Sequence, residues 1–223
     1  MGNKNQQFIP KATKPFVNLP KKAATICLSV ICKNESKTAL RMLESAAPLL
    51  DHYIVVDTGS TDGTQEIVRN FFAEKKIPGQ VYEHKRKNFG DARMKALELA
   101  KASGCSHSIR IDFDEVFTYD KQFNVNIFKA NLANFDGGNI KVTYGGQNYF
   151  RMQIFSNNKP WYWYGPLHEC LMCDVPTQVA EVHGLGTFVR PDGNSWVAET
   201  IQQKYEGHAR LLESYVATDE KKD

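Results

Sequence analysis

The chain has 223 residues, of which 42% are hydrophobic and 24% are charged. This composition supports a packed core, excludes a chain that is disordered throughout, and suits a single domain at this length. The net charge of +3 is too small to indicate a nucleic-acid-binding protein. No stretch approaches the roughly 18 apolar residues of a membrane span, and the polar start lacks the apolar core of a signal peptide. We therefore expect a cytoplasmic protein, with a peripheral location at a membrane surface left open.

Strand-like and helix-like segments alternate along the first half of the chain. Short runs rich in β-branched residues predict buried strands at 25–33, 52–57, 80–84 and 106–112. Apolar residues at helical spacing predict helices at 35–50, within 58–75 after the turn residues that begin this segment, and at 89–104. We expect Asn34 to cap the first helix, and Asp62 and Gln65 to form a capping box for the second. The pattern predicts an α/β fold with a mainly parallel central sheet flanked by helices on both faces.

The alternation stops after residue 120. One helix is expected at 123–135, and the strand-like segments at 138–146, 147–156 and 178–189 indicate a smaller antiparallel region. A final amphipathic helix is expected at 195–217. The second half therefore reads as an elaboration of the domain formed by the first half.

Polar side chains follow three of the predicted strands. They are Lys33, Asn34 and Glu35 after the first, Asp57 after the second, and Asp112 and Asp114 after the fourth. The last two carboxylates share a face because strands have a period of two, and such a pair favours a nearby cation. Taken alone, they could equally form a solvated turn. Because ligands bind at the carboxyl ends of parallel strands, the convergence of three strand ends favours a ligand site.

The class of ligand is narrowed by motifs that are missing. The chain has neither a G-x-G-x-x-G after its first strand nor a P-loop. A D-x-D pair can hold Mg²⁺ or Mn²⁺ together with phosphate oxygens. Such a cation would neutralise charge on a departing diphosphate.

Six motifs then occur in an order that resembles family 2 glycosyltransferases of the GT-A fold. They are KNE (33–35), VVDTGSTDGT (55–64), NFGDAR (88–93), DFDE (112–115), an R-x-x-x-F motif at 151–155 and WYWYGPLHE (161–169). The resemblance runs from about Thr25 to about His183. It looks closest to the branch that contains bacterial lipopolysaccharide-core glucosyltransferases and peptide glycosyltransferases.

The resemblance implies an inverting transferase that uses Mn²⁺ or Mg²⁺ and a nucleotide-diphosphate sugar, with a UDP-sugar expected. The acceptor would be a hydroxyl on a glycan, a lipid-linked saccharide or a protein. On this basis, residues 1–23 are a flexible polar tail and 24–223 form a single domain. We divide that domain into a nucleotide-sugar-binding half (24–118), an acceptor-side half (119–193) and a C-terminal helix (194–223).

Site residues are carried over by position. The resemblance places these on the nucleotide sugar: Lys33, Asn34, Glu35, Asp57, Gly59, Ser60, Arg93, Asp112 and Phe113. Asp114 and Asp112 would bind the metal, with His168 as an extra ligand. Glu169 is the candidate general base, although it could instead orient the acceptor or pair with Arg151. Candidate acceptor contacts are Arg151, Trp161 and Trp163. Sugar rings stack well on aromatic faces, but aromatic side chains also dominate ordinary cores, so both interpretations of the tryptophans stay open.

Two positions depart from the family pattern, and two other functions stay open. Phe113 stands where Ala is common, and its side chain should point away from the acids. Met94 replaces an Asn, which removes a polar contact and leaves a non-catalytic nucleotide-sugar-binding protein as one alternative. IRIDFDEV also fits a phosphatase of the haloacid-dehalogenase type, but no second acidic pair follows. The sequence does not identify the sugar, the nucleobase, the acceptor or the oligomeric state.

Overall fold

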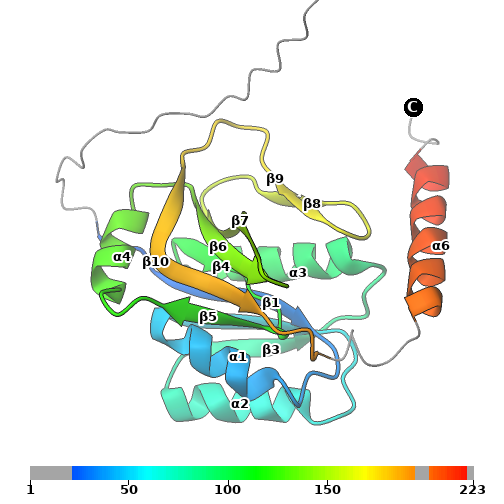
Figure 1. The fold of residues 1–223 in the computed structure, drawn as a ribbon, viewed down its shortest axis with the longest axis horizontal. Coiled ribbons are helices and arrows are strands. Elements are labelled where there is room, and N and C mark those ends of the chain that lie inside the picture. Colours follow the sequence, from blue (N-terminus) through cyan, green and yellow to red (C-terminus); the bar gives the residue numbers. More distant parts are fainter. Residues whose placement is uncertain (1–21, 194–200, 220–223) are drawn as a thin grey trace, which may run out of the picture.

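The computed structural model describes residues 22–193 and 201–219. It contains an eight-stranded sheet of order β3-β2-β1-β4-β7-β6-β10-β5 and a two-stranded sheet, β8-β9 (Figure 1). The strands are β1 (Ile26–Cys32), β2 (His52–Asp57), β3 (Gly79–Glu83), β4 (His107–Ile109), β5 (Glu115–Tyr119), β6 (Gly137–Tyr144), β7 (Gln147–Ser156), β8 (Tyr162–Tyr164), β9 (Cys170–Met172) and β10 (Val179–Val189). The helices are α1 (Ala39–Ala46), the 3₁₀ turn η1 (Ala47–Leu49), α2 (Thr64–Lys75), α3 (Phe89–Ala102), α4 (Val125–Leu132) and α6 (Ile201–Asp219).

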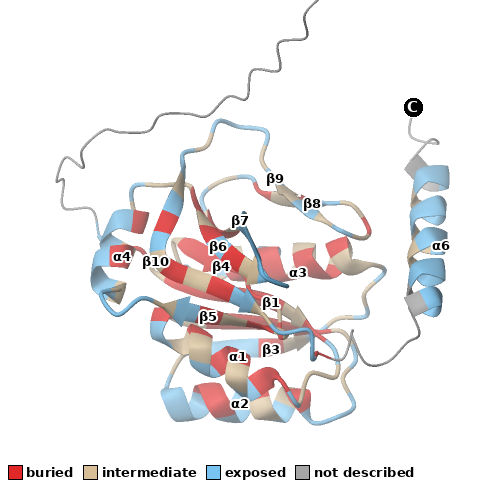
Figure 2. Ribbon diagram, viewed as in Figure 1, coloured by how far each residue is buried: buried red, intermediate tan, exposed pale blue. Residues whose placement is uncertain are grey.

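The first four strands form the predicted parallel half of the sheet. β1 lies between β2 and β4, and β3 continues the parallel order on the far side of β2. α1 and α2 cover one face, and α3 covers the other (Figure 1). The α1–α2 face buries Leu28, Val55 and Phe72, whereas Cys27 and Ile54 pack against α3. Burial on both faces explains why these strands are nearly continuous apolar runs (Figure 2).

The second half of the chain extends the same sheet. β7 joins β4 in antiparallel register, with Ile109 opposite Ile154, and β6 pairs with β7 as the predicted hairpin. β10 runs parallel to β6 and antiparallel to β5. The sequence did not predict β5 as a strand, because its only partner in the sheet is β10, which lies far along the chain. The second-half strands are therefore continuous with the parallel half, and the parallel β6–β10 pair departs from the expected antiparallel pairing.

Neither predicted cap forms as expected, although α2 begins at Thr64, close to its predicted start. α1 begins at Ala39 after Thr38, and Asn34 adopts a left-handed backbone with φ 57°. Gln65 forms no capping box, because its side chain donates to Asp57 instead, at 3.1 Å. These polar residues connect neighbouring loops of the candidate site, which is why local capping rules misplace them.

The final helix, α6, stands beside the sheet domain and is mostly exposed (Figure 2). Its predicted start, residues 195–200, lies outside the described residues, as do residues 1–21 of the predicted tail. Within 22–193 and 201–219, no helix is both long enough and apolar enough to cross a membrane.

Candidate functional site

The loops that follow β1 and β2 are fastened to each other. The amide of Asn34 donates to the Ser60 hydroxyl and the amide of Glu35 to the Thr64 hydroxyl, each at 2.8 Å. The Asn34 side chain accepts from the Thr61 amide at 2.8 Å. The structure therefore brings together the predicted nucleotide-binding residues of the first two strand ends.

Asp57 is fully buried at the end of β2, and its carboxylate organises the turn that follows. Oδ1 accepts from the amides of Gly59 and Ser60 at 2.9 and 2.8 Å, and Oδ2 accepts from the Cys32 thiol at 3.3 Å. Burial disfavours the charged form, but these hydrogen bonds outweigh it and lower the pKa of Asp57. Gly59 has φ 105°, a conformation that side chains disfavour. Contact of Asp57 with a nucleoside stays a prediction.

Asp112 lies between two arginines. Its Oδ1 accepts from Arg93 at 2.9 Å and its Oδ2 accepts from Arg110 at 3.2 Å. Both guanidinium groups lie over the ring of Trp163, with Cζ 5.3 and 5.2 Å from the ring centroid. Burial opposes ionisation of Asp112, but Arg93, Arg110 and Arg151 outweigh it and hold the pKa of Asp112 well below its usual range.

Arg93 also donates to Glu169, so one side chain joins the D-x-D motif to the HE motif. The side chains of Arg93 and Glu169 are only 10% and 9% exposed. Arg151 does not pair with Glu169, as one interpretation allowed. It donates to both carboxylate oxygens of Glu115, each at 2.7 Å.

The close approach of two glycines places Glu169 beside Arg93. A Cβ added to Gly90 on α3 would lie 2.3 Å from the carbonyl oxygen of Gly165, so any side chain there would collide with backbone. The next residue of the loop, Pro166, accepts from the Phe89 amide at 3.2 Å. NFGDAR therefore needs its glycine so that the 165–169 loop can dock on the first turn of α3.

Gly193 packs against both Asp114 and the KNE loop. A Cβ added to Gly193 would lie 3.0 Å from the Asp114 Cβ and 3.3 Å from Glu35 Oε2. The Arg190 amide donates to the Asp114 carbonyl at 2.6 Å. The chain after β10 therefore packs between the first and fourth strand ends.

Three aromatic residues that were assigned to ligand contacts are buried. Trp161 and Trp163 are 4% and 8% exposed and pack against Leu97 and Phe155, so they are not surface contacts for an acceptor. Phe113 is 3% exposed and belongs to the main core, so its side chain cannot contact a nucleotide sugar. The prediction that it points away from the acids was right, because side chains alternate along an extended chain.

Two residues of the site were missed, Arg110 and Glu115. Arg110 is 8% exposed in an otherwise apolar segment, and burial together with neighbouring Arg93 lowers its pKa to about 10. The cationic Arg110 within the otherwise apolar start of IRID could have indicated a buried ion pair, because buried charges need partners. Glu115 was given no role within the DFDE motif, because β5 was not recognised.

A family model described as Glycosyl transferase family 2 matches residues 27–167, more than half of the chain. The chain belongs to glycosyl transferase family 2. Its matched region includes the KNE loop, the D-x-D motif and all but the last two residues of WYWYGPLHE. A search of curated proteins found no match.

Solved structures confirm the GT-A fold of this family 2 member. S. aureus TarS 1-349 has a TM-score of 0.54 and 15% identity, over 75% of this chain and 60% of that chain. The same protein in complex with UDP-GlcNAc has a TM-score of 0.50 and 16% identity, over 79% of this chain and 62% of that chain. The family 2 chain therefore spans about 60% of the length of these solved chains, and at these identities the likeness shows the fold.

The donor groups of the site fit a divalent cation only in part. Both oxygens of Asp112 accept from arginines, and the described residues contain no cluster of three His, Cys, Asp or Glu suited to a metal. Asp114 offers a carboxylate, and Mg²⁺ or Mn²⁺ can be held by one carboxylate together with phosphates and water. The exposed His168 stacks edge-to-face with His208 of α6, with ring centroids 5.9 Å apart. Its role as a ligand stays a prediction.

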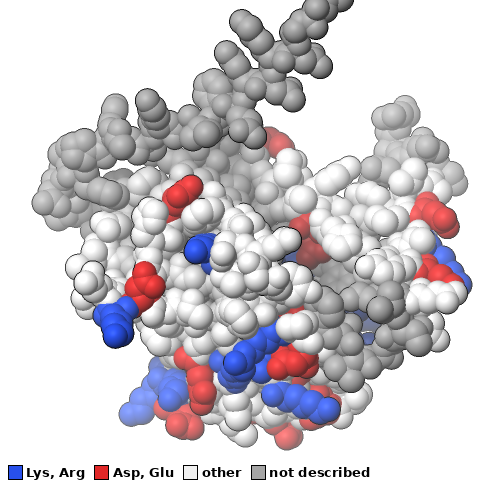
Figure 3. Space-filling view, viewed as in Figure 1, with Lys and Arg blue, Asp and Glu red and all other residues white. Residues whose placement is uncertain are grey.

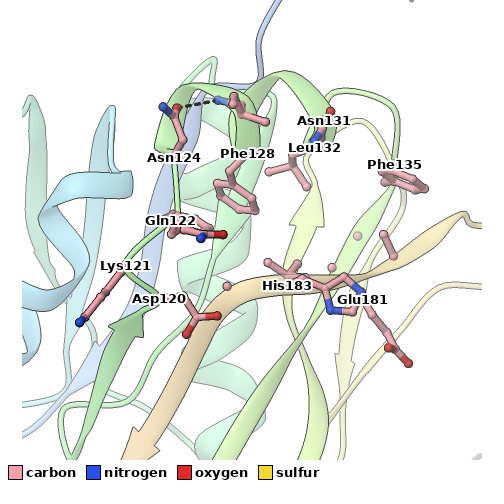
Figure 4. Close-up of a pocket in the computed structure, with 17 residues that line it drawn as sticks. Asp120, Lys121, Gln122, Asn124, Phe128, Asn131, Leu132, Phe135, Glu181 and His183 are labelled. Carbon is pink, nitrogen blue, oxygen red and sulfur yellow. Dashed lines mark hydrogen bonds between the residues drawn. The ribbon is translucent and has the colours of Figure 1, made fainter. Parts of the chain in front are cut away.

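A separate cavity of about 640 Å³ lies beside α4. Figure 4 shows Phe128 of α4 and Gln122 facing His183 of β10 across this space. β5 leads away from Asp114 toward Asp120, which lines the cavity, so the cavity lies at the opposite end of the sheet from the D-x-D motif. It is not part of the candidate site.

Proposed function

We propose that this protein is a glycosyltransferase that moves a sugar from a nucleotide-diphosphate sugar, in the first instance a UDP-sugar, to an acceptor hydroxyl with inversion. The observation that carries the proposal is the chain of ion pairs from the half-buried Asp112 through the buried Arg93 to Glu169. It joins a D-x-D motif to a candidate base in a family 2 fold. The complex of TarS with UDP-GlcNAc supports uracil as the nucleobase of the donor.

Each part of the site then has a role. The braced loops that contain Lys33–Glu35 and Gly59–Ser60 hold the nucleoside. Asp114 would hold a Mn²⁺ or Mg²⁺ ion, which when bound offsets charge on the diphosphate. Glu169 takes the proton of the acceptor hydroxyl as that oxygen attacks the sugar carbon, and the bond from this carbon to the diphosphate oxygen breaks so that the nucleoside diphosphate leaves. Arg93 donates to Oε1 of Glu169, so we assign proton uptake to Oε2.

We place this activity in the cytoplasm and in a single domain, 24–223. The five cysteines form no disulfide, which fits a reducing compartment. The family match overturns the phosphatase alternative. The remaining alternative is a protein that binds the nucleotide sugar without transferring the sugar. Met94 is not specific evidence for this alternative, because its side chain packs with the buried tryptophans.

Thermal unfolding with UDP-, GDP-, CMP- and dTDP-sugars, each with and without Mn²⁺, tests donor binding. At a ligand concentration 100 times Kd, binding stabilises the fold by about 2.7 kcal/mol, which raises Tm by about 5–10 °C. We expect this shift for the UDP-sugar with metal and its loss in Asp114→Ala. No shift with any donor, or an undiminished shift in the variant, would contradict the proposal.

Glu169→Gln then separates transfer from binding alone. The amide keeps the shape of the side chain but cannot take up the proton. We expect an unchanged donor-induced shift and a transfer rate lowered by about 10²–10⁴-fold. An unchanged rate removes Glu169 as the base. Donor binding by the wild type without any transfer favours the non-catalytic alternative.

A further inference from the structure

One face of the outer sheet carries exposed aromatic and polar side chains in two neighbouring rows. Across the strands β7, β6, β10 and β5, the register aligns Phe150, Lys141, Gly186 and Thr118. The next row consists of Asn148, Thr143, Phe188 and Val116. Residues that are directly paired, or two apart on one strand, point to the same face. We call these two rows the outer face.

The outer face is hollowed around its glycine. Phe150 and Phe188 are 48% and 42% exposed, whereas Gly186 between them has no side chain. A hollow of about 340 Å³ is lined by Phe150, Gly186, Lys141 and neighbours. A second, of about 580 Å³, is lined by Phe188 and the tip of the β6–β7 hairpin. Phe150 therefore lines one hollow and Phe188 the other, and we call the two hollows together the trough.

The trough begins at the candidate site. Val189, which follows Phe188, pairs with Glu115, and the Arg190 amide donates to the Asp114 carbonyl at 2.6 Å. The trough then leads along β10 toward Gly184, away from the D-x-D motif. A molecule that lies in it would have one end beside Asp114.

The chemistry of the outer face suits sugars. Aromatic rings present apolar faces for stacking, and the hydroxyls of Thr118 and Thr143 with the ammonium group of Lys141 supply hydrogen bonds between them. Charged side chains gather over α1 and α2, whereas few lie over β10 and the β6–β7 hairpin (Figure 3). From ordinary strand spacings, Phe150 and Phe188 are roughly 12 Å apart, more than the width of one sugar ring.

We propose that the outer face binds the acceptor, and that the acceptor is an oligosaccharide chain. This inference rests on the proposed transferase function. An extended peptide would instead add to a free sheet edge, which at this end of the sheet is β5, whereas Phe150 and Phe188 lie on β7 and β10, each paired on both sides. Polar side chains separate the two phenylalanines, so the face is no continuous apolar surface for a lipid tail.

Single substitutions at the two phenylalanines test the proposal. The full chain, with UDP and Mn²⁺ present, is applied to an array of immobilised natural oligosaccharides. We expect the wild type to bind at least one glycan, and Phe150→Ala and Phe188→Ala to weaken binding at least about tenfold. Tyr149→Ala is the matched control, because Tyr149 is 44% exposed on the same strand but points to the opposite face. It should stay within about twofold of the wild type.

Two results would overturn the proposal: no glycan bound by the wild type, or equal binding by all three variants. The UDP-sugar thermal shift is measured in parallel on every variant. A normal shift without glycan binding rejects the outer face while leaving the transferase intact. A missing shift in the wild type rejects the proposed function itself, whatever the array shows. Unchanged Tm values without ligand establish that the variants fold.

Discussion

Arg93 is the residue through which the two acidic motifs contact each other. Removal of its charge would leave the buried Glu169 carboxylate without its cation, whereas Asp112 would keep Arg110. We expect Arg93→Met to lower the free energy of unfolding by about 3–5 kcal/mol, because an uncompensated buried charge is costly. Arg93→Lys should lose less, since it keeps the charge but not the two-sided fork. Urea denaturation measures both, and a loss below about 1 kcal/mol for Arg93→Met would contradict the bridging role.

The Asp62 carboxylate makes the stability of the fold depend on pH in the acidic range. Its carboxylate accepts from the amides of Ser36 and Thr64 at 3.0 and 3.1 Å and from the Thr64 hydroxyl at 2.5 Å. Despite opposing burial, these bonds lower its pKa to about 2 from the usual 3.8. A carboxylate whose pKa is lower in the folded state stabilises the fold above pH 3.8, and this contribution is lost as the pH falls toward 2.

Asp62→Asn removes this titration while keeping one acceptor oxygen. We expect the urea midpoint of the wild type to fall more steeply between pH 4 and 2 than that of the variant. Other carboxylates titrate in both proteins, so the difference between the two curves isolates Asp62. If the urea midpoints of the two proteins fall in parallel with pH, the charged form of Asp62 does not stabilise the fold more than the neutral form.

At the scale of elements, the contact between α3 and the 165–169 loop depends on a glycine. In Gly90→Ala, the new Cβ would meet the Gly165 carbonyl, and the loop that carries Glu169 would have to shift. We expect a loss of about 1–3 kcal/mol in stability, as for other overpacked sites, and a lower transfer rate.

Gly207→Ala on α6 is the matched control for Gly90→Ala. Apart from its chain neighbours and the backbone of its own helix, no atom of the described residues lies within 4 Å of its added Cβ, so alanine should be neutral or stabilise the helix by up to about 1 kcal/mol. If Gly90→Ala behaves like this control, the loop does not depend on the close approach.

The elements differ in how far the sequence could predict them. β1 and β2 were predicted within one residue of each end because dense apolar runs identify buried parallel strands locally. β5 was missed because its pairing with β10 is set by the fold and not by its own pattern. Asn34 and Gln65 were misread as caps because their hydrogen bonds reach other loops.

The same limit applies to the site. The motif order located the strand-end carboxylates, because parallel strands deliver their ends to one edge. It could not show that Asp112 is held by Arg93 and Arg110, or that Trp163 covers both, because these contacts join segments distant in sequence. Roles that depend on a bound donor, such as those of Asp57 and Asp114, stay predictions.

At the scale of the whole molecule, the two halves of the chain share one sheet and one buried ion pair. Arg151 of β7 reaches Glu115 of β5 across the two strands that lie between them. Glu115 is only 3% exposed, and its carboxylate also accepts from the Asp112 amide at 3.1 Å. Burial and the neighbouring Asp112 raise its pKa, so Arg151 is the group that makes its charge tolerable. The pair therefore couples the second half of the chain to the D-x-D motif.

A double-mutant cycle with Arg151→Met and Glu115→Gln measures this coupling. Arg151→Met alone should lower the free energy of unfolding by about 3 kcal/mol, because it leaves Glu115 buried without its partner. Once Glu115 is neutral, Arg151→Met should cost much less. The loss in free energy of unfolding of the double variant should therefore be smaller than the sum of the two single losses by about 1–3 kcal/mol. Urea unfolding of the four proteins gives the cycle. Additive losses would mean that the sheet alone, and not this ion pair, holds the two halves together.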